Sequence, residues 1–237
     1  MNKKILWSVF PVLLVSHAFA HQPRTAESQF VEVANPEVSQ AFYAELRGKP
    51  AVYQINSGKP FRLYVGLLLP DLPGVRRDVS AEILRIEAGT MERLAFLDGS
   101  SYSWSPFFEP FAGDDYLRGP EFGAPDSSKG SILEGREVPS GTYRVRVFNS
   151  DNQGKYALVF GDLERWPVAE VLNAFVLIPE IKQSFFEKSF WPAYFNRFNL
   201  ILGAAFLVPL IIMVLLVRTI VHIFRRHRVR SRIQEAS

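Results

Sequence analysis

The chain has 237 residues, and its composition excludes several classes of protein. Apolar residues make up 48% and aromatic residues 14%, which suffices for a buried core and excludes a wholly disordered chain. There is no cysteine, so disulfides, thiolate metal sites and cysteine nucleophiles are excluded. Of four histidines, only His21 lies outside the terminal segments described below. A catalytic triad or a two-histidine metal site would have to be built around that residue alone.

The net charge of +3 is misleading, because the charges are segregated along the chain. Residues 21–217 carry 19 basic and 23 acidic side chains, whereas the last twenty residues carry six arginines and one glutamate. The basic character therefore belongs to a tail. A nucleic-acid partner is not expected.

Residues 1–20 have the features of a secretory signal peptide. Two lysines precede an apolar stretch, Ile5–Val15, and Ala18-Phe-Ala20 supplies a small-x-small cleavage pattern. The alternative is an uncleaved anchor, but this stretch is shorter than the roughly 20 residues that cross a bilayer. We therefore expect cleavage after this segment and a mature chain that begins at His21.

An uninterrupted apolar run, Leu200–Val217, predicts a transmembrane helix near the other end. We assign residues 198–217 to the span and 218–237 to a basic cytoplasmic tail, because arginines stay on the cytoplasmic side. Together with a signal peptide, one span predicts a type I single-pass protein of the cytoplasmic membrane. Its N-terminal domain would be periplasmic or on the cell surface.

Side chains on either side of the span have the types expected at membrane interfaces. Aromatic residues gather at the outer membrane–water interface, and basic side chains attract anionic lipid headgroups. The expected interface residues are Phe190, Trp191, Tyr194 and Phe195, and the expected headgroup ligands are Arg225, Arg226 and Arg228.

Residues 21–162 alternate apolar and polar side chains with a period of two, which predicts β-strands. Examples are Phe61–Leu67 and Tyr143–Val147, the second of which places arginines on one face. Short strands separated by turns predict two packed antiparallel sheets. Only Glu37–Leu46 is predicted to form a helix or a turn.

This domain resembles the bacterial prepeptidase C-terminal domain in three stretches. They are Ala51-Val-Tyr-Gln-Ile-Asn-Ser-Gly-Lys-Pro-Phe-Arg-Leu-Tyr-Val65, Gly141-Thr-Tyr-Arg-Val-Arg-Val147 and Gly154-Lys-Tyr-Ala-Leu-Val-Phe160. The resemblance covers about residues 51–161 and implies a jelly-roll-like β-sandwich that serves binding or secretion without catalysis. The chain departs from the usual context of that family, because no protease domain is attached and the module has its own anchor.

Between this domain and the span, residues 163–197 change to a helical period. Apolar residues recur there at three- and four-residue steps: Val168, Val171, Leu172, Phe175 and Val176, and, after Pro179, Ile181, Phe185 and Phe186. We expect one or two short amphipathic helices that connect the domain to the span and lie against the bilayer or the domain.

The segment Tyr102–Asp126 is the main candidate for function, since it combines aromatic and acidic residues with four prolines. Long loops in compact domains are commonly functional, and we expect this segment to be one. Aromatic side chains there could stack on sugars or anchor a protein partner, and a structural alternative is that they plug one end of the sandwich core. The candidate contact residues are Trp104, Phe107, Phe108, Glu109, Phe111 and Tyr116.

The acidic residues of the same segment allow two further interpretations. Asp114, Asp115 and Glu121 could hold calcium, although their spacing fits no fixed calcium loop and they could simply cap turns. Glu109 with Asp114 or Glu121 could form the carboxylate pair of a glycosidase-type hydrolase. An N-terminal His21 could chelate copper, but a second histidine ligand is missing, so we expect a disordered first residue.

Taken together, these features predict a mainly β protein with an antiparallel jelly-roll-like sandwich, short amphipathic helices and one transmembrane helix. The expected function is non-catalytic binding or assembly in the cell envelope, with a membrane protein or an envelope polymer as partner and no cofactor. The alternatives are a glycan- or calcium-binding surface domain and a carboxylate-based envelope hydrolase.

Overall fold

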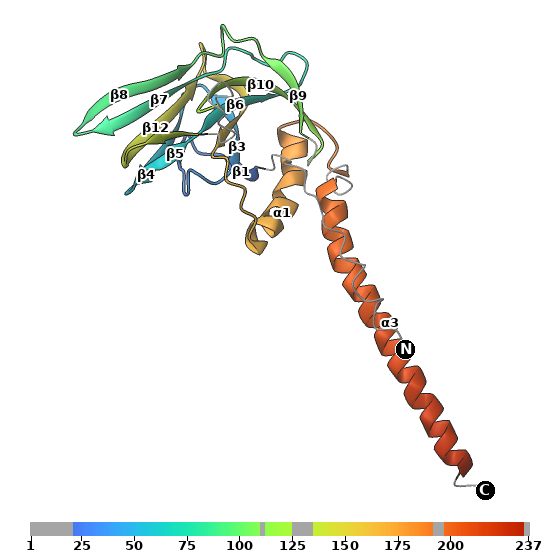
Figure 1. Cartoon of the computed structure of the whole chain (residues 1–237). Helices are drawn as coiled ribbons and strands as arrows, with labels where there is room; N and C mark the ends of the chain where they lie inside the picture. Colours follow the sequence, from blue (N-terminus) through green and yellow to red (C-terminus); the bar gives the residue numbers. More distant parts are fainter. Residues whose placement is uncertain (1–20, 110–111, 125–134, 192–196, 235–237) are drawn as a thin grey trace.

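The computed structural model describes residues 21–109, 112–124, 135–191 and 197–234. The predicted signal peptide, residues 1–20, lies outside these ranges. Within them, the chain forms β-strands as far as Phe160, followed by helix α1 and then the long helix α3 (Figure 1). The fold is therefore mainly β, as the alternating pattern predicts.

One mixed sheet has six strands in the order β1-β3-β13-β6-β10-β9 among the described residues. β1 pairs with β3 in parallel, and the other pairs are antiparallel. The strands are β1 Gln22–Ala26, β3 Gln40–Arg47, β13 Gln153–Phe160, β6 Val65–Pro70, β10 Asp114–Phe122 and β9 Ser105–Glu109.

A second mixed sheet has five strands in the order β2-β4-β12-β7-β8 over the same ranges. β2 pairs with β4 in parallel, so the predicted antiparallel pairing is wrong for one pair in each sheet. Its strands are β2 Phe30–Glu32, β4 Ala51–Ser57, β12 Gly141–Phe148, β7 Ser80–Glu87 and β8 Thr90–Leu97. A small pair joins β5 Phe61–Leu63 to β11 Arg136–Val138.

The two large sheets share one hydrophobic core, and we call them together the two-sheet domain. Phe42, Leu67 and Tyr156 enter the core from the six-stranded sheet, and Tyr53 and Val145 enter it from the five-stranded sheet. The hydroxyl groups of Tyr53 and Tyr156 are 3.0 Å apart and share a hydrogen bond between the sheets. Both tyrosines are fully buried, so this bond satisfies two polar groups that burial would otherwise leave unpaired.

The centre of the six-stranded sheet is buried on both faces. Along β13, Leu158 packs into the shared core, whereas Ala157 and Val159 pack into a second apolar cluster on the outer face. This second face explains why the prediction for Glu37–Leu46 is wrong. In β3, Ala41 packs in the outer cluster and Phe42 in the shared core, so consecutive apolar residues hide the alternation of a strand.

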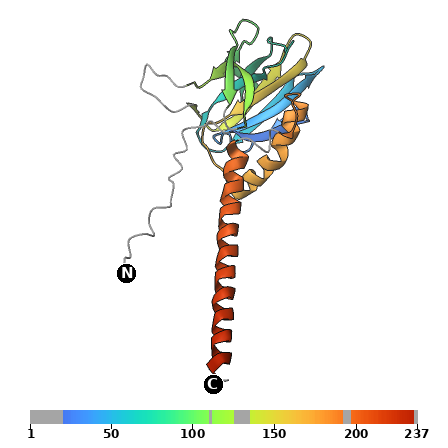
Figure 2. The same ribbon diagram turned by 90° about the vertical axis from the view of Figure 1, so that its right-hand side faces the viewer.

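Helix α1, Val168–Ser184, covers the outer face of the six-stranded sheet (Figure 2). It continues through Pro179 as a single helix of 17 residues. Ile181 of α1, with Phe185 and Phe186 just after it, belongs to the outer cluster. The connector is thus a packed layer of the domain.

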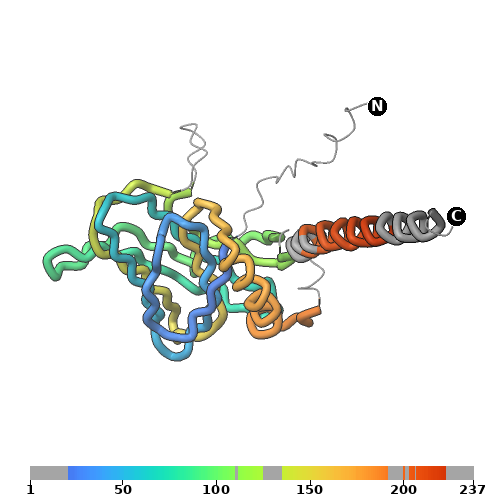
Figure 3. Tube along the Cα trace, turned by 90° about the horizontal axis from the view of Figure 1, so that it is seen from below, coloured from blue at the N-terminus to red at the C-terminus, as the bar shows by residue number. Residues whose placement is uncertain are grey.

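Helix α3, Arg197–Gln234, leaves the domain as a single long helix (Figure 3). Its segment Gly203–His222 has 20 residues and a mean hydropathy of 2.6, and the described structure does not bury it. By length and composition, it is able to cross a membrane. This segment begins and ends five residues later than the predicted span 198–217, and the helix continues into the basic tail.

Candidate functional site

The interface between α1 and the six-stranded sheet gathers the most unusual chemistry of the described residues. Ala174, Ile178, Ile181 and Lys182 are the buried residues of α1. Three of them are apolar, as the helical period requires, but the fourth carries a charge. A fully buried lysine is rare unless it is paired, so its partner determines how the helix is held.

Lys182 forms an ion pair with Asp114 at the start of β10. Its Nζ donates to Asp114 Oδ1 at 2.7 Å, and the two side chains are only 2% and 3% exposed. Burial raises the pKa of Asp114, and the hydrogen bond from Lys182 opposes that rise. This contact joins residues 68 positions apart in the chain. It fixes the register of α1 on the sheet, since any slip of the helix would leave both charges buried and unpaired.

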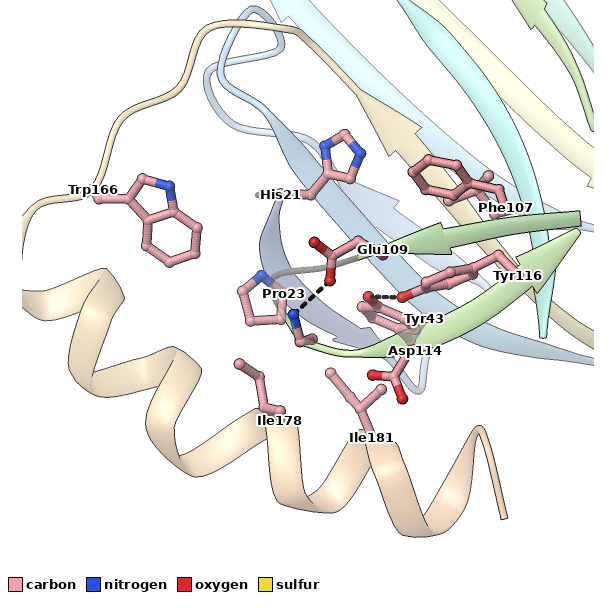
Figure 4. A pocket seen from close by; sticks show the side chains of 12 residues that line it. His21, Pro23, Tyr43, Phe107, Glu109, Asp114, Tyr116, Trp166, Ile178 and Ile181 are labelled. Carbon is pink, nitrogen blue, oxygen red and sulfur yellow. Dashed lines mark hydrogen bonds between the residues drawn. The ribbon is translucent and has the colours of Figure 1, made fainter. Parts of the chain in front are cut away.

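Polar groups of neighbouring strands extend this site. The hydroxyl groups of Tyr43 and Tyr116 share a hydrogen bond of 2.7 Å, and burial raises the pKa of both phenols. Glu109 accepts the backbone N–H of Ala112 at 2.6 Å, across the turn that joins β9 to β10. Glu109 and Asp114 are opposite each other in the hairpin, so both lie on the face towards α1 (Figure 4).

His21 closes one side of this site. Its Nδ1 is 2.6 Å from Ser39 Oγ, which contradicts the expectation of a disordered first residue. Strand β1 pairs with β3 from Gln22 onward, and this pairing holds the histidine in place. Burial, with the guanidinium of Arg118, lowers the pKa of His21 to about 4. The imidazole is therefore neutral at pH 7.

The cavity among these groups has a volume of about 30 Å³, enough for one or two water molecules. His21, Glu109, Asp114 and Tyr116 line it from the strands, and Ile181 lines it from α1 (Figure 4). A sugar ring does not fit into this volume. The arrangement is suited to holding a helix on a sheet. Glu109 and Asp114, one of the two suggested hydrolase pairs, line this cavity beneath α1, whereas Glu121 of the other pair does not.

The aromatic segment is a β-hairpin, so the prediction of a long loop over Tyr102–Asp126 is wrong. Trp104 is part-buried and donates its indole N–H to the carbonyls of Arg77 and Gly99, each at 2.8 Å. Phe107 lies beneath Arg118, whose guanidinium is 4.3 Å from the ring centroid. Most of these side chains therefore support the structure.

The other predicted contact residues differ in exposure. Tyr116 is buried and Glu109 nearly so, whereas Phe108 is 57% exposed on the edge strand β9. Phe111 lies outside the described residues. Of the predicted contact residues that the structure describes, Phe108 presents the most accessible aromatic surface for a partner.

The three predicted calcium ligands do not meet. Asp114 binds Lys182, Asp115 accepts a hydrogen bond from Lys188 at 3.0 Å, and Glu121 accepts one from Tyr64 at 2.6 Å near the other end of β10. The part of the chain that the structure describes holds no group of three or more His, Asp or Glu residues placed to hold a metal ion.

The predicted membrane-facing residues are described only in part. Phe190 and Trp191 stack with their centroids 4.9 Å apart, and Trp191 is 62% exposed. Tyr194 and Phe195 lie outside the described residues. The side chains of Arg225, Arg226 and Arg228 are likewise not described, although the backbone there belongs to α3.

The structure also has a partly exposed aromatic pair that could not be recognised from the sequence alone. Phe96 on β8 is 46% exposed and stacks on Phe148 of β12, with centroids 6.2 Å apart. The guanidinium of Arg146 lies 4.9 Å from the Phe148 ring, and that of Arg93 lies 5.7 Å from Phe96. The sequence contains a signal for one member of this pair. Arg144, Arg146 and Phe148 are two residues apart along one strand, so Phe148 is on the same outward face as the arginines.

Comparisons with known proteins add little. No family model matches the chain, and no curated protein matches it. Among solved structures, the pre-peptidase C-terminal domain of a collagenase from Bacillus anthracis is 11% identical, with 60% of this chain and 95% of that chain covered and a TM-score of 0.30. It belongs to the family that residues 51–161 resemble.

A second solved structure bears the description "AvmM Catalyzes Macrocyclization in Alchivemycin A Biosynthesis". It is 14% identical, with 58% of this chain and 62% of that chain covered, and its TM-score is 0.19. Neither TM-score is high enough to carry an argument about this chain.

Proposed function

We propose that this protein is a non-catalytic assembly subunit of the cell envelope, anchored by α3 with its two-sheet domain outside the cytoplasm. The proposal depends most on one observation, the docking of α1 onto the sheet through the buried pair Lys182–Asp114. A binding module that searches for ligands benefits from a flexible tether. A subunit that must meet a membrane partner in one orientation benefits from a rigid one.

The contacts around α1 support the rigid alternative. Phe185 and Phe186 continue the packing beyond the helix, with Phe186 at 5.0 Å from the ring of Tyr116. Lys155 binds Glu187 at 2.8 Å, and Lys188 binds Asp115. The chain is thus held to the domain as far as residue 188. Few residues remain before α3 begins at Arg197.

The topology and the finer fold are parts of the same proposal. The arginines that follow the apolar segment favour a cytoplasmic C-terminus. We interpret the two sheets around one core as a jelly-roll-like sandwich of the prepeptidase C-terminal type, whose members bind and do not catalyse. The cover that α1 places over Glu109 and Asp114 supports the absence of carboxylate catalysis.

The test is photo-crosslinking of the full-length protein in native membranes, followed by mass spectrometry. The photoreactive residue replaces Phe96 in one variant and Phe108 in another. Both side chains are exposed, and they lie on different sheets. We expect one stoichiometric membrane protein to be recovered from one of these positions. Lys182→Met in the same background should abolish that crosslink, whereas Lys188→Met should retain it.

Two results would contradict the subunit proposal. One is recovery of the same partner at the same yield when Lys182→Met has released α1. The other is the absence of any stoichiometric protein partner from both positions.

The exposed stack of Phe96 and Phe148 favours a second candidate, a glycan-binding surface. Aromatic faces on a flat sheet stack on sugar rings, and Arg146, bound to Glu82 at 2.6 Å, adds hydrogen-bond donors beside them. For this candidate, Phe96→Ala should reduce retention of the protein on envelope polysaccharide, whereas Phe108→Ala should not. Equal retention of the two variants would exclude this stack as the binding site.

A further inference from the structure

Helix α1 has a second apolar face that is exposed in the described structure. Val168, Leu172 and Val176 are 76%, 58% and 68% exposed, and their four-residue spacing places them on one side of the helix. The buried face, centred on Ala174, Ile178 and Ile181, points in another direction. α1 therefore separates the sheet from a stripe of apolar side chains, which we call the α1 stripe.

No charged side chain interrupts the α1 stripe. The one acidic residue of the first turn, Glu170, turns aside and binds Arg24 of β1 at 2.7 Å. Glu180 is exposed and follows Val176 by four residues, so it ends the stripe at its C-terminal side without interrupting it. Apolar surface of this kind is costly to leave exposed to water, because transfer of apolar side chains out of water is favourable.

A lipid surface is within reach of the α1 stripe at all times. The apolar segment of α3 starts at Gly203, and only eleven residues separate it from Trp191. From Trp191, six residue steps of extended chain lead to the start of α3, and six more steps along the helix lead to Gly203. The distance between Trp191 and Gly203 is therefore at most about 30 Å. Figures 1 and 2 agree that the Val168 end of α1 points in the same direction as the C-terminal end of α3. The exposed Trp191 lies between the two helices in the chain, and tryptophan favours membrane interfaces.

We propose that the α1 stripe lies in the headgroup region of the bilayer that α3 crosses, so that α1 is held between the sheet and the lipid. This inference rests on the proposed membrane anchoring. A second copy of the chain is the other occupant to consider, but three side chains fall far short of the roughly 800 Å² per partner that stable interfaces bury. Binding of the stripe to the bilayer needs no such buried area, because α3 keeps the chain beside the membrane and the effective concentration of lipid is always high.

The consequence for function is an orientation. With α1 on the lipid, the outer face of the six-stranded sheet is turned towards the membrane. The outer face of the five-stranded sheet, with Phe96 and Phe148, is then turned away from it and available to a partner or an envelope polymer. This orientation specifies that the proposed subunit presents the outer face of its five-stranded sheet to a partner.

The chain suits a spin-label test, because it has no cysteine of its own. Leu172→Cys carries a nitroxide on the α1 stripe, and Glu180→Cys carries one at the exposed polar position beyond the end of the stripe, two turns of the helix away, as the matched control. The full-length protein is placed in nanodiscs of phosphatidylcholine and phosphatidylglycerol. Power saturation then compares collisions with oxygen, which concentrates in lipid, and with a water-soluble nickel chelate.

We expect oxygen to relax the label at position 172 several-fold more strongly than the nickel chelate, with the order reversed at position 180. Equal accessibility of both labels to nickel would overturn the inference. So would dipolar broadening at position 172 that disappears on dilution with unlabelled protein, because a second copy would then cover the stripe. Val176→Cys serves as a second probe if the first variant does not fold.

Carbonate extraction of the same preparations separates the two proposals. If the protein stays in the membrane while label 172 meets water, only the placement of α1 fails. If carbonate releases the protein, the proposed anchoring fails.

Discussion

Replacing Lys182 by methionine should loosen α1 more than any other single charge removal in the described structure. The substitution keeps the length of the apolar stem but leaves the Asp114 carboxyl buried at 3% exposure without its partner. Breaking a buried pair in this way costs about 3–5 kcal/mol. Because burial already raises the pKa of Asp114, the orphaned carboxyl can take up a proton, which places the expected loss at the lower end, about 3 kcal/mol.

The assay is urea unfolding of the full-length protein in micelles, followed by the fluorescence of Trp166, which packs against Ala174 and Ile178 of α1. Lys188→Met is the control, because the Lys188–Asp115 pair is 38% and 54% exposed and should contribute no more than about 1 kcal/mol. The double variant Lys182→Met/Asp114→Leu should regain most of the loss. Equal losses for Lys182→Met and Lys188→Met would refute the reasoning, as would a double variant no more stable than the single one.

Three further predictions concern the rest of the domain. The free energy of unfolding should fall by at most about 3 kcal/mol as the pH drops from 6.5 to 4, because the folded state resists protonation of His21. The midpoint of urea unfolding, measured as a function of pH, should therefore decrease over this range, and His21→Gln should remove most of that decrease. Tyr156→Phe should lower the free energy of unfolding by about 1–2 kcal/mol, because it leaves the Tyr53 hydroxyl unpaired. In the same urea titration, the double variant Tyr53→Phe/Tyr156→Phe should lose less than the sum of the losses of the two single variants. Gly99→Ala would place a Cβ 1.8 Å from the carbonyl oxygen of Val79, and its melting temperature should drop by an amount equivalent to about 3 kcal/mol; an unchanged value would contradict this backbone arrangement.

Strands with one polar face could be predicted from the sequence. In β12 the arginines and the core residues alternate as the two faces of a half-buried strand require, and the structure has that strand at Gly141–Phe148. The apolar segment of α3 could also be predicted, because length and hydropathy depend on no other part of the chain. Both predictions use local information only.

The cover over the six-stranded sheet was predicted only as one of two alternatives, helices against the bilayer or against the domain, although a stronger signal for it existed. Val65–Pro70 and Tyr156–Phe160 are apolar runs without alternation, which is typical of strands buried on both faces. Such runs predict a further layer, and α1 is that layer. The same cover made β3 look like a helix, because apolar residues face both sides of it.

The candidate site could not be predicted, because it depends on a contact between distant residues. Nothing near Lys182 in the sequence distinguishes it from a solvated helix charge, and nothing near Asp114 distinguishes it from a turn cap. Only the register of β10 and the docking of α1 bring them within 2.7 Å. Similarly, the prolines of Tyr102–Asp126 suggested a loop, whereas Pro106 lies on the edge strand β9, where a missing N–H is tolerated.

The central claim is that α1 is a packed layer of the domain and holds it in one orientation beside the span. Hydrogen exchange of the full-length protein in nanodiscs tests this most directly, because exchange reports the free energy of local opening. The account predicts that the amides of residues 172–184 are protected nearly as strongly as those of β13. Exchange of those helix amides within seconds, while β13 remains protected, would contradict it.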